Sequence, residues 1–223
     1  MTNTELKIAT TFKACVLDVD GTLLDTSEFI YLAFECILKK FGFNVPSRDV
    51  LIAKTGKRLE VDYAVLTELT DTDELCREHR AFQNKHQDLV RAFPHVRDTL
   101  LTLKKRGIKL SAATTRSKIT STASLQNALI YEDAEGKPMF DLILYAENSK
   151  AKPDPDSILQ SLSKLGVPAR KCLMIGDRES DIQAGKNANV VTVGVTYGCS
   201  GREIIKSNPD FVIDDIRELL TLV

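Results

Sequence analysis

From residue 94 to residue 223 the chain alternates between two kinds of segment. Short apolar runs, typical of buried β-strands, are "IKLSAATT", "FDLILYAE", "KCLMIGD", "VVTVGVT" and "DFVID". Segments with a helical period separate them, among them "VRDTLLTLKKRG", "PDSILQSLSKLG" and "GREIIKSN". Strict alternation with short turns favours parallel strand pairing with helices on both faces of the sheet. The chain is therefore predicted to have an α/β fold with a parallel sheet.

One more strand is predicted before this region, over residues 12–19, and a long helical stretch follows it. The first helix of that stretch, "SEFIYLAFECILKKFGF", can be capped by Ser27 and ended by Gly42. Up to about residue 92 the sequence keeps a helical period and has few strand signals. The simplest organisation is a discontinuous core of residues 1–24 and 93–223, interrupted by an all-helical insert of residues 25–92.

Composition argues against several classes of protein. The formal net charge of −1 gives no general attraction to nucleic acid or to an anionic membrane, and no stretch approaches a membrane span in length. Five cysteines without CxxC or CxxH spacing predict reduced thiols, with Cys15 and Cys172 inside buried strands. The N-terminal segment lacks a signal-peptide pattern. We expect a cytoplasmic monomer or homodimer without nucleic-acid or membrane partners.

Polar residues follow the predicted strands at the points where the strands end. Because ligands of parallel α/β sheets bind at the carboxyl ends of the strands, these residues are expected to converge on one site. They are Asp18 and Asp20 after the first strand, Thr114 and Thr115 after the second, Lys152 after the third and Asp177 after "CLMIG".

The charges of this set predict its chemistry. Asp18 and Asp20 are two residues apart on an extended backbone and therefore point the same way. Together with Asp177 they make three negative groups, which would not ionise together without a cation. A hard divalent ion such as Mg²⁺ prefers oxygen ligands and commonly adds a substrate phosphate, and Lys152 supplies a further positive charge. The sequence thus predicts a Mg²⁺-assisted phosphoryl site.

Four segments carry a resemblance to a known family. "DVDGTLLDT", the strand ending "SAATT", "KPDPD" and "GDRESD" resemble, in the same order, the four motifs of the haloacid dehalogenase-like hydrolase superfamily. The match covers nearly the whole chain and is most similar to the branch of phosphoglycolate phosphatases. The resemblance implies a Rossmann-like parallel sheet core with a small all-helical cap domain inserted after the first motif, which is the organisation predicted above.

The resemblance also implies a role for each matching residue. Asp18 would be the nucleophile that forms an aspartyl phosphate and binds Mg²⁺. Asp20 would protonate the leaving oxygen and then activate water, with its backbone carbonyl on the metal. Thr114 would bind a phosphoryl oxygen, and Lys152 would neutralise charge beside it. The remaining implied residues are Asp177 as a metal ligand, Asp181 acting through water or neighbouring groups, and Gly21 and Thr115 beside the phosphate.

The cap offers one candidate specificity segment, "AKTGKRLE". In family members with such caps, the loop between cap helices faces the active site. Here Gly56 permits a tight turn, and Lys57 and Arg58 are cations that would suit a leaving group carrying its own anion. The expected partner is a small phosphorylated metabolite, with phosphoglycolate-like compounds favoured.

Two arginines depart from the family's usual pattern, and two histidines lie in the predicted cap. Arg178 stands where the family commonly has Ser or Thr, and Arg116 lies in the segment where Asn is usual. Both are predicted to be solvated loop arginines. His79 and His86 lie in the charged stretch "CREHRAFQNKHQDL" and are predicted to be at the surface of a cap helix.

Other functions remain open from the sequence. A sugar phosphomutase of the same fold would keep the aspartyl phosphate long enough to return it to its product. A non-hydrolytic phospho-accepting signalling or binding protein would also use an aspartate and Mg²⁺ on a parallel sheet. Such receiver domains, however, are usually smaller and lack the helical insert and the DxDGT pattern.

Overall fold

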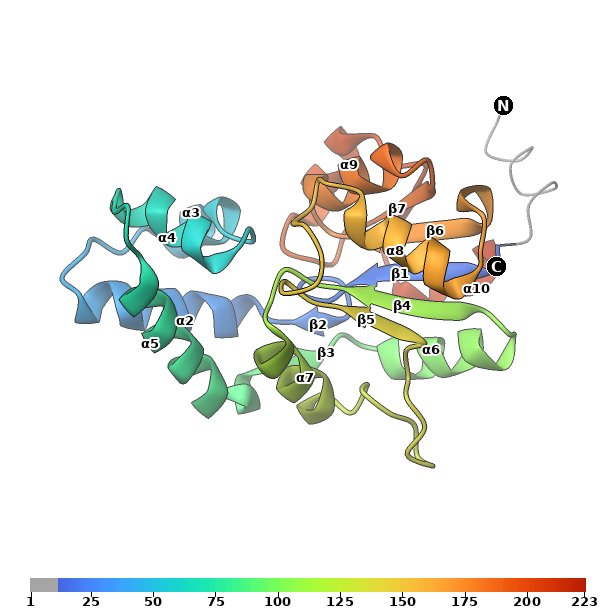
Figure 1. Ribbon diagram of the computed structural model, residues 1–223, viewed down its shortest axis with the longest axis horizontal. Helices are drawn as coiled ribbons and strands as arrows, with labels where there is room; N and C mark the ends of the chain where they lie inside the picture. Colours follow the sequence, from blue (N-terminus) through green and yellow to red (C-terminus); the bar gives the residue numbers. More distant parts are fainter. Residues whose placement is uncertain (1–11) are drawn as a thin grey trace.

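A computed structural model describes residues 12–223 and shows a parallel sheet with a helical lobe beside it (Figure 1). The six strands pair in the order β5-β4-β1-β6-β7-β8, all parallel. They span Ala14–Asp18 (β1), Lys109–Ala113 (β4), Leu142–Leu144 (β5), Cys172–Gly176 (β6), Val191–Val195 (β7) and Phe211–Ile213 (β8). The predicted α/β fold is confirmed, and β1, which carries Asp18, lies at the middle of the sheet.

Helices cover both faces of this sheet, as the alternation predicts. The longer ones are α6 (Val96–Lys105), α7 (Lys118–Asn127), α8 (Asp156–Leu165) and α9 (Glu179–Asn187). Alternate residues of β1 point to opposite faces: Cys15 and Leu17 pack into a cluster with α6 and α7, whereas Ala14 and Val16 pack with α8 and α9. Both strand cysteines, Cys15 and Cys172, are fully buried, as predicted.

Four helices form the cap: α2 (Ser27–Lys40), α3 (Arg48–Lys54), α4 (Leu59–Thr67) and α5 (Asp73–Lys85). They enclose an apolar cluster of their own, which includes Phe34, Leu38 and Tyr63. A two-stranded antiparallel ribbon joins the cap to the core, with β2 (Leu24–Asp25) paired to β3 (Arg91–Ala92). The short 3₁₀ helix η1 (Gln87–Leu89) leads from α5 into β3. The sequence does not predict this ribbon, because two residues are too few to show a strand period.

Local differences from the predicted elements are small. The segment expected to be a helix after β7 is 3₁₀-helical, η3 (Gly201–Ser207). The closing helix divides into η4 (Ile216–Glu218) and α10 (Leu219–Leu222), and η2 (Ala169–Lys171) precedes β6. Thr26, rather than Ser27, occupies the N-cap position of α2. Within residues 12–223, no helix combines the length and apolarity needed to cross a membrane.

Candidate active site

A buried group of three carboxylates and one ammonium lies at the carboxyl ends of the strands. Asp18 ends β1, Asp177 follows β6, Asp181 lies in the first turn of α9, and Lys152 lies between β5 and α8. Lys152 Nζ bonds to a carboxylate oxygen of Asp18 and lies 2.5 Å from Asp181 Oδ1. The Lys152 side chain is only 5% exposed. These charges therefore compensate one another largely out of contact with water.

Burial sets the protonation behaviour of this group. Burial raises the pKa of Asp18 well above its usual range, against the attraction of Lys152, and the negative charges of Asp181 and Asp177 add to the rise. For the same main reason, together with the charge of Asp181, the pKa of Asp177 rises to about 6. Burial works against the charged form of Lys152, but Asp18 and Asp181 outweigh it and raise its pKa. The site thus has more negative charge than its lysine balances.

The carboxylate oxygens fit a hard divalent cation. One oxygen each of Asp18, Asp177 and Asp181 can lie within 4.8 Å of the others, and all three residues are buried. Oδ2 of Asp177 accepts a hydrogen bond from the Cys199 backbone N–H at 2.8 Å, whereas its Oδ1 is buried and has no hydrogen-bond partner among residues 12–223. An unpartnered buried carboxylate oxygen is unfavourable unless a cation binds it. These residues therefore suit Mg²⁺.

Close backbone packing surrounds Asp177. Gly21 has φ +84°, and a Cβ there would clash with the Asp177 carboxylate. Gly198 packs against Asp177 and Gly21 just as closely, so a side chain there is equally excluded. The contacts of Gly198 and Cys199 were missed in the sequence, where the glycine of "YGCSG" was the available signal. The loops after β1, β6 and β7 therefore meet around one carboxylate.

Of the two threonines after β4, one is buried and the other lines the cavity. Thr114 is 4% exposed, and its Oγ1 accepts a hydrogen bond from the Arg116 backbone N–H at 3.1 Å. Thr115 lines the cavity above the site, whereas Thr114 does not. The predicted phosphate-binding role of Thr114 stays a prediction.

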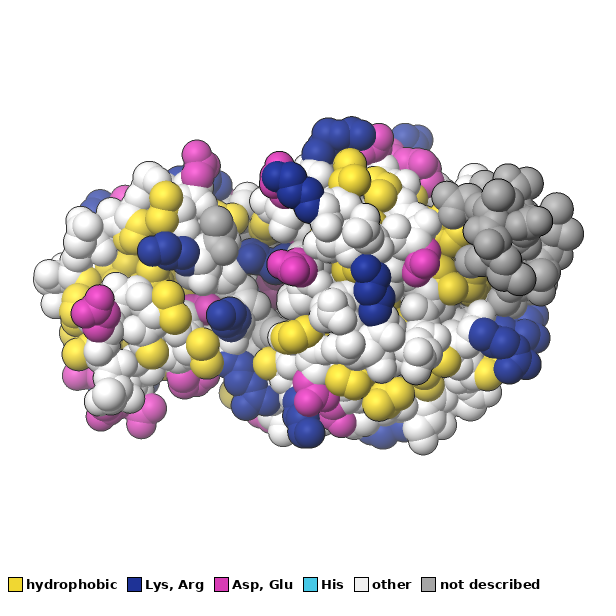
Figure 2. Space-filling model, turned by 90° about the horizontal axis from the view of Figure 1, so that it is seen from above, with side chains coloured by type: hydrophobic (Ala, Val, Ile, Leu, Met, Phe, Trp, Pro, Cys, Tyr) yellow, Lys and Arg dark blue, Asp and Glu magenta, His cyan; other side chains and the backbone are white. Residues whose placement is uncertain are grey.

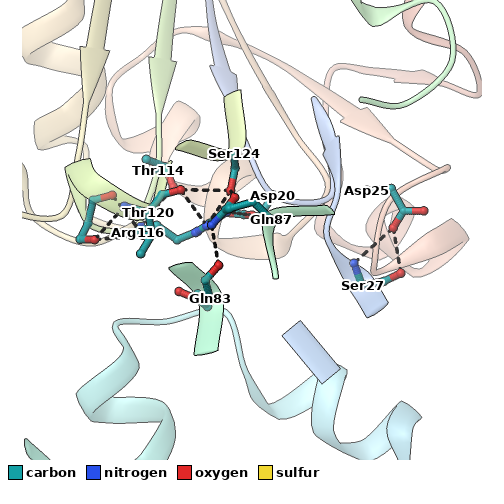
Figure 3. A network of polar contacts seen from close by, with 10 residues as sticks. Asp20, Asp25, Ser27, Gln83, Gln87, Thr114, Arg116, Thr120 and Ser124 are labelled. Atoms are coloured by element: carbon teal, nitrogen blue, oxygen red, sulfur yellow. Dashed lines mark hydrogen bonds and ion pairs between the residues drawn. The ribbon is translucent and has the colours of Figure 1, made fainter. Parts of the chain in front are cut away.

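Asp20 lies at the cavity wall and bonds to an arginine (Figure 3). Arg116 donates to Asp20 Oδ1 at 3.1 Å, to the Thr120 carbonyl at 3.1 Å and to Ser124 Oγ at 2.8 Å. Its guanidinium also lies 5.0 Å from the ring centre of Phe29. The prediction of a solvated Arg116 is wrong, because partners from the loop after β1 and from α7 enclose it to 11% exposure.

Two further arginines connect the core and the cap in opposite directions. Arg178, from the core, donates to the cap carbonyls of Thr55 at 2.6 Å and Ile52 at 3.5 Å. Arg58, from the cap, donates to the core carbonyls of Ala146 at 3.1 Å and Ser149 at 2.9 Å. The prediction of a solvated Arg178 is therefore wrong, because helix α3 ends directly above it.

The predicted cap loop does face the site. Gly56 has φ +113°, and a Cβ there would lie 2.6 Å from Arg178 Cζ, so glycine fits on both grounds. The Gly56 and Lys57 backbone N–H groups donate to the Asp62 carboxylate at 2.9 and 3.2 Å. Gly56, Lys57 and Arg58 all line the cavity, but the Lys57 side chain is exposed.

The cavity between cap and core has a volume of about 550 Å³. Asp18, Asp20 and Lys152 line its core side, and the loop around Gly56 lines its cap side. Figure 2 shows Lys and Arg side chains gathered around the boundary between the two lobes. The cavity has room for a small phosphorylated molecule beside the carboxylates.

His79 lies on the wall of the same cavity but within the cap interior. It is 1% exposed, its Nδ1 is 2.9 Å from the Tyr63 hydroxyl, and its ring meets Phe34 edge-on. Burial, with a smaller contribution from Arg116, lowers its pKa to about 3. The prediction of a surface histidine is wrong for His79, because apolar residues of α2 and α4 cover it.

Comparisons with known proteins show to which family the chain belongs. The model of the family described as haloacid dehalogenase-like hydrolase matches residues 15–195. A pyrophosphatase PpaX of Oceanobacillus iheyensis is 33% identical over 215 residues, which cover 95% of this chain and 96% of that protein. A pyrophosphatase PpaX of Bacillus pumilus is 30% identical, with 96% and 97% covered.

Solved structures extend the same comparison. A hydrolase from Pseudomonas syringae superposes with a TM-score of 0.81 at 27% identity, covering 94% of this chain and 96% of its own. A predicted phosphoglycolate phosphatase from Haemophilus somnus 129pt has a TM-score of 0.82 at 23% identity, covering 96% and 99%. The latter likeness supports the fold alone.

Proposed function

Because the chain belongs to the haloacid dehalogenase-like hydrolase family, we propose that it is a Mg²⁺-dependent phosphatase acting through an aspartyl phosphate on Asp18. The observation that carries this proposal is the buried group of Asp18, Asp177, Asp181 and Lys152, with one oxygen of Asp177 unpartnered. Asp18 and Asp177 would hold the metal, with Asp181 beside them. When bound, Mg²⁺ supplies positive charge that offsets the carboxylates and the phosphoryl oxygens.

The chain's own residues then divide the reaction between them. The Asp18 carboxylate attacks phosphorus, the bond from phosphorus to the leaving oxygen breaks, and Asp20 gives that oxygen a proton. Water next attacks the phosphorus of the aspartyl phosphate, and Asp20 takes its proton, which restores Asp18 and releases phosphate. Lys152 offsets the charge on Asp18 and on the phosphoryl group throughout. The cap limits the access of bulk water to the intermediate.

The cavity favours a compact substrate whose leaving group is itself an anion. Its volume of about 550 Å³ and the cations of the cap loop suit the carboxylate of phosphoglycolate or the second phosphate of pyrophosphate. Support comes from relatives at 30–33% identity that are named pyrophosphatases. A small phosphorylated metabolite is therefore the proposed partner.

The proposal is tested by phosphate release from pyrophosphate, phosphoglycolate, sugar phosphates and p-nitrophenyl phosphate, each with Mg²⁺ or with EDTA. We expect Mg²⁺-dependent release, and a loss of about 1,000-fold or more in Asp18→Asn, since the amide cannot form the acyl phosphate. Circular dichroism checks that this variant is folded. Isomerised sugar phosphate without net release would instead indicate the phosphomutase. No release from any compound would indicate a binding protein.

A further inference from the structure

Asp20 is held by a side chain that is itself rigidly held. Besides Asp20, the guanidinium of Arg116 bonds to Thr120 and Ser124 of α7 and lies over the ring of Phe29. A planar guanidinium with several fixed contacts has little freedom to move, so it restricts the carboxylate bonded to it. Within residues 12–223, Oδ2 of Asp20 accepts no hydrogen bond, which leaves that oxygen free for the reaction.

Further hydrogen bonds connect Ser124, a partner of Arg116, to the cap. Ser124 Oγ lies 2.6 Å from Gln87 Oε1, and Gln87 Nε2 donates to the Gln83 carbonyl in the last turn of α5 at 2.7 Å (Figure 3). Gln87 belongs to η1, where the chain leaves the cap. Gln87 does not line the cavity, and its link to Asp20 runs through Ser124 and Arg116, whereas its other partner, Gln83, lines the cavity.

A second residue holds the segment by which the chain leaves the cap, residues 87–90, without contacting Arg116. We call these residues the exit segment. Asn127 Nδ2 donates to the carbonyls of Gln87 at 2.8 Å and Val90 at 3.2 Å. Removing Asn127 therefore loosens the exit segment but leaves the contacts of Arg116 in place. The chain thus offers a matched control for the path through Ser124.

We propose that Arg116 is a positioning residue that orients the Asp20 carboxylate toward the leaving oxygen. Through Gln87 and Ser124, the position of the cap's exit segment influences this orientation. The proposal rests on the proposed function, since it needs Asp20 as the proton donor. A misdirected proton donor slows departure of a poor leaving group strongly and that of a good leaving group little. A role confined to folding would slow both alike.

The experiment compares an alkyl phosphate, glycerol 3-phosphate, with p-nitrophenyl phosphate, whose leaving group departs without a proton. For Arg116→Met, which keeps the packing on Phe29, we expect kcat/KM, which reports only the steps up to departure of the leaving group, to fall about 10- to 100-fold on the alkyl ester and less than about 3-fold on the aryl ester. Arg116→Lys should recover part of the difference. For Gln87→Met, the loss on the alkyl ester should again exceed the loss on the aryl ester, but by less. For Asn127→Ala, the two losses should be equal.

Asp20→Asn provides the reference, because it should give the largest difference between the losses on the two esters. If wild type with Mg²⁺ releases phosphate neither from these two esters nor from the compounds that test the proposed function, the proposed function fails. If wild type and Asp20→Asn behave as expected but Arg116→Met and Arg116→Lys lose equally on both esters, the positioning role of Arg116 is wrong. If Gln87→Met behaves like Asn127→Ala, the coupling to the cap is wrong. Thermal unfolding of each variant shows whether the protein still folds.

Discussion

The carboxyl end of the sheet and the boundary between core and cap are both rich in charge, but they use it differently. At the sheet end, Asp18, Lys152 and Asp181 compensate one another in a buried group fixed by neighbouring strands. At the boundary, Arg58 and Arg178 donate to backbone carbonyls of the opposite lobe. Removing one residue of the buried group leaves another buried charge unpaired. Removing one arginine at the boundary breaks only the hydrogen bonds of that arginine.

The largest stability effect is expected at the sheet end. Lys152→Met leaves the Asp18 and Asp181 carboxylates without their cation, so the free energy of unfolding in EDTA should fall by about 3–5 kcal/mol. Urea unfolding measures this loss. Lys164→Met, on the exposed side of α8, is the matched control and should stay within about 0.5 kcal/mol of wild type. A loss below about 1 kcal/mol for Lys152→Met would remove the contrast between the two regions.

The cap interior should show a pH dependence due to His79. The unfolded imidazole binds a proton below pH 6.5, whereas the folded one does so only near pH 3, so protons favour the unfolded state between these values. Stability from this group is complete above pH 6.5 and is lost by about 1.4 kcal/mol per pH unit as the pH falls.

The comparison of wild type with His79→Gln isolates this contribution. Glutamine stays neutral and should remove the slope, whereas the raised pKa values of Asp18, Asp62 and Asp177 act in the opposite direction in both proteins. Urea midpoints between pH 7.5 and 5 measure the difference. Equal slopes in the two proteins would contradict a neutral, buried His79.

A smaller and more local effect is expected at the boundary. Arg178→Ser removes the bonds to the Thr55 and Ile52 carbonyls, each charged hydrogen bond being worth about 1.5–3 kcal/mol. Hydrogen exchange at the Gly56 amide should become about 10-fold faster or more, while amides of β1 keep their rates. Arg58→Ala should show the same separation. Faster exchange throughout the sheet would mean that the arginine supports the core as a whole.

The smallest effect is expected for Lys57→Ala, since the side chain is exposed and only its backbone is held by Asp62. Stability should change by less than about 0.5 kcal/mol. The kcat/KM for phosphoglycolate or pyrophosphate should fall about 2- to 5-fold relative to p-nitrophenyl phosphate at low salt, because an exposed charge attracts an anion weakly. Equal changes for all substrates would exclude Lys57 from specificity.

The same contrast explains what the sequence could predict. Asp18, Lys152 and Asp177 were predicted to converge because strand ends in a parallel sheet meet at one edge. Arg116 and Arg178 could not be placed, since Arg116 bonds to Asp20, 96 residues away along the chain, and Arg178 bonds to the Thr55 carbonyl, 123 residues away, a group that any residue supplies. His79 lies in a helix of mostly polar residues, and its apolar cover comes from other helices.

The central place of β1 has a consequence for how the chain folds during synthesis. Ala14 pairs with Lys109 on one side and with Cys172 on the other, so the strand bearing Asp18 has no neighbour until Lys109 has been made and lacks its second until Cys172 has been made. The apolar cluster of the cap lies within residues 30–76, so all its members have been made before the partner strands of β1. Non-local pairing is slow to form, so we expect the cap to acquire order first and the sheet to close around β1 last.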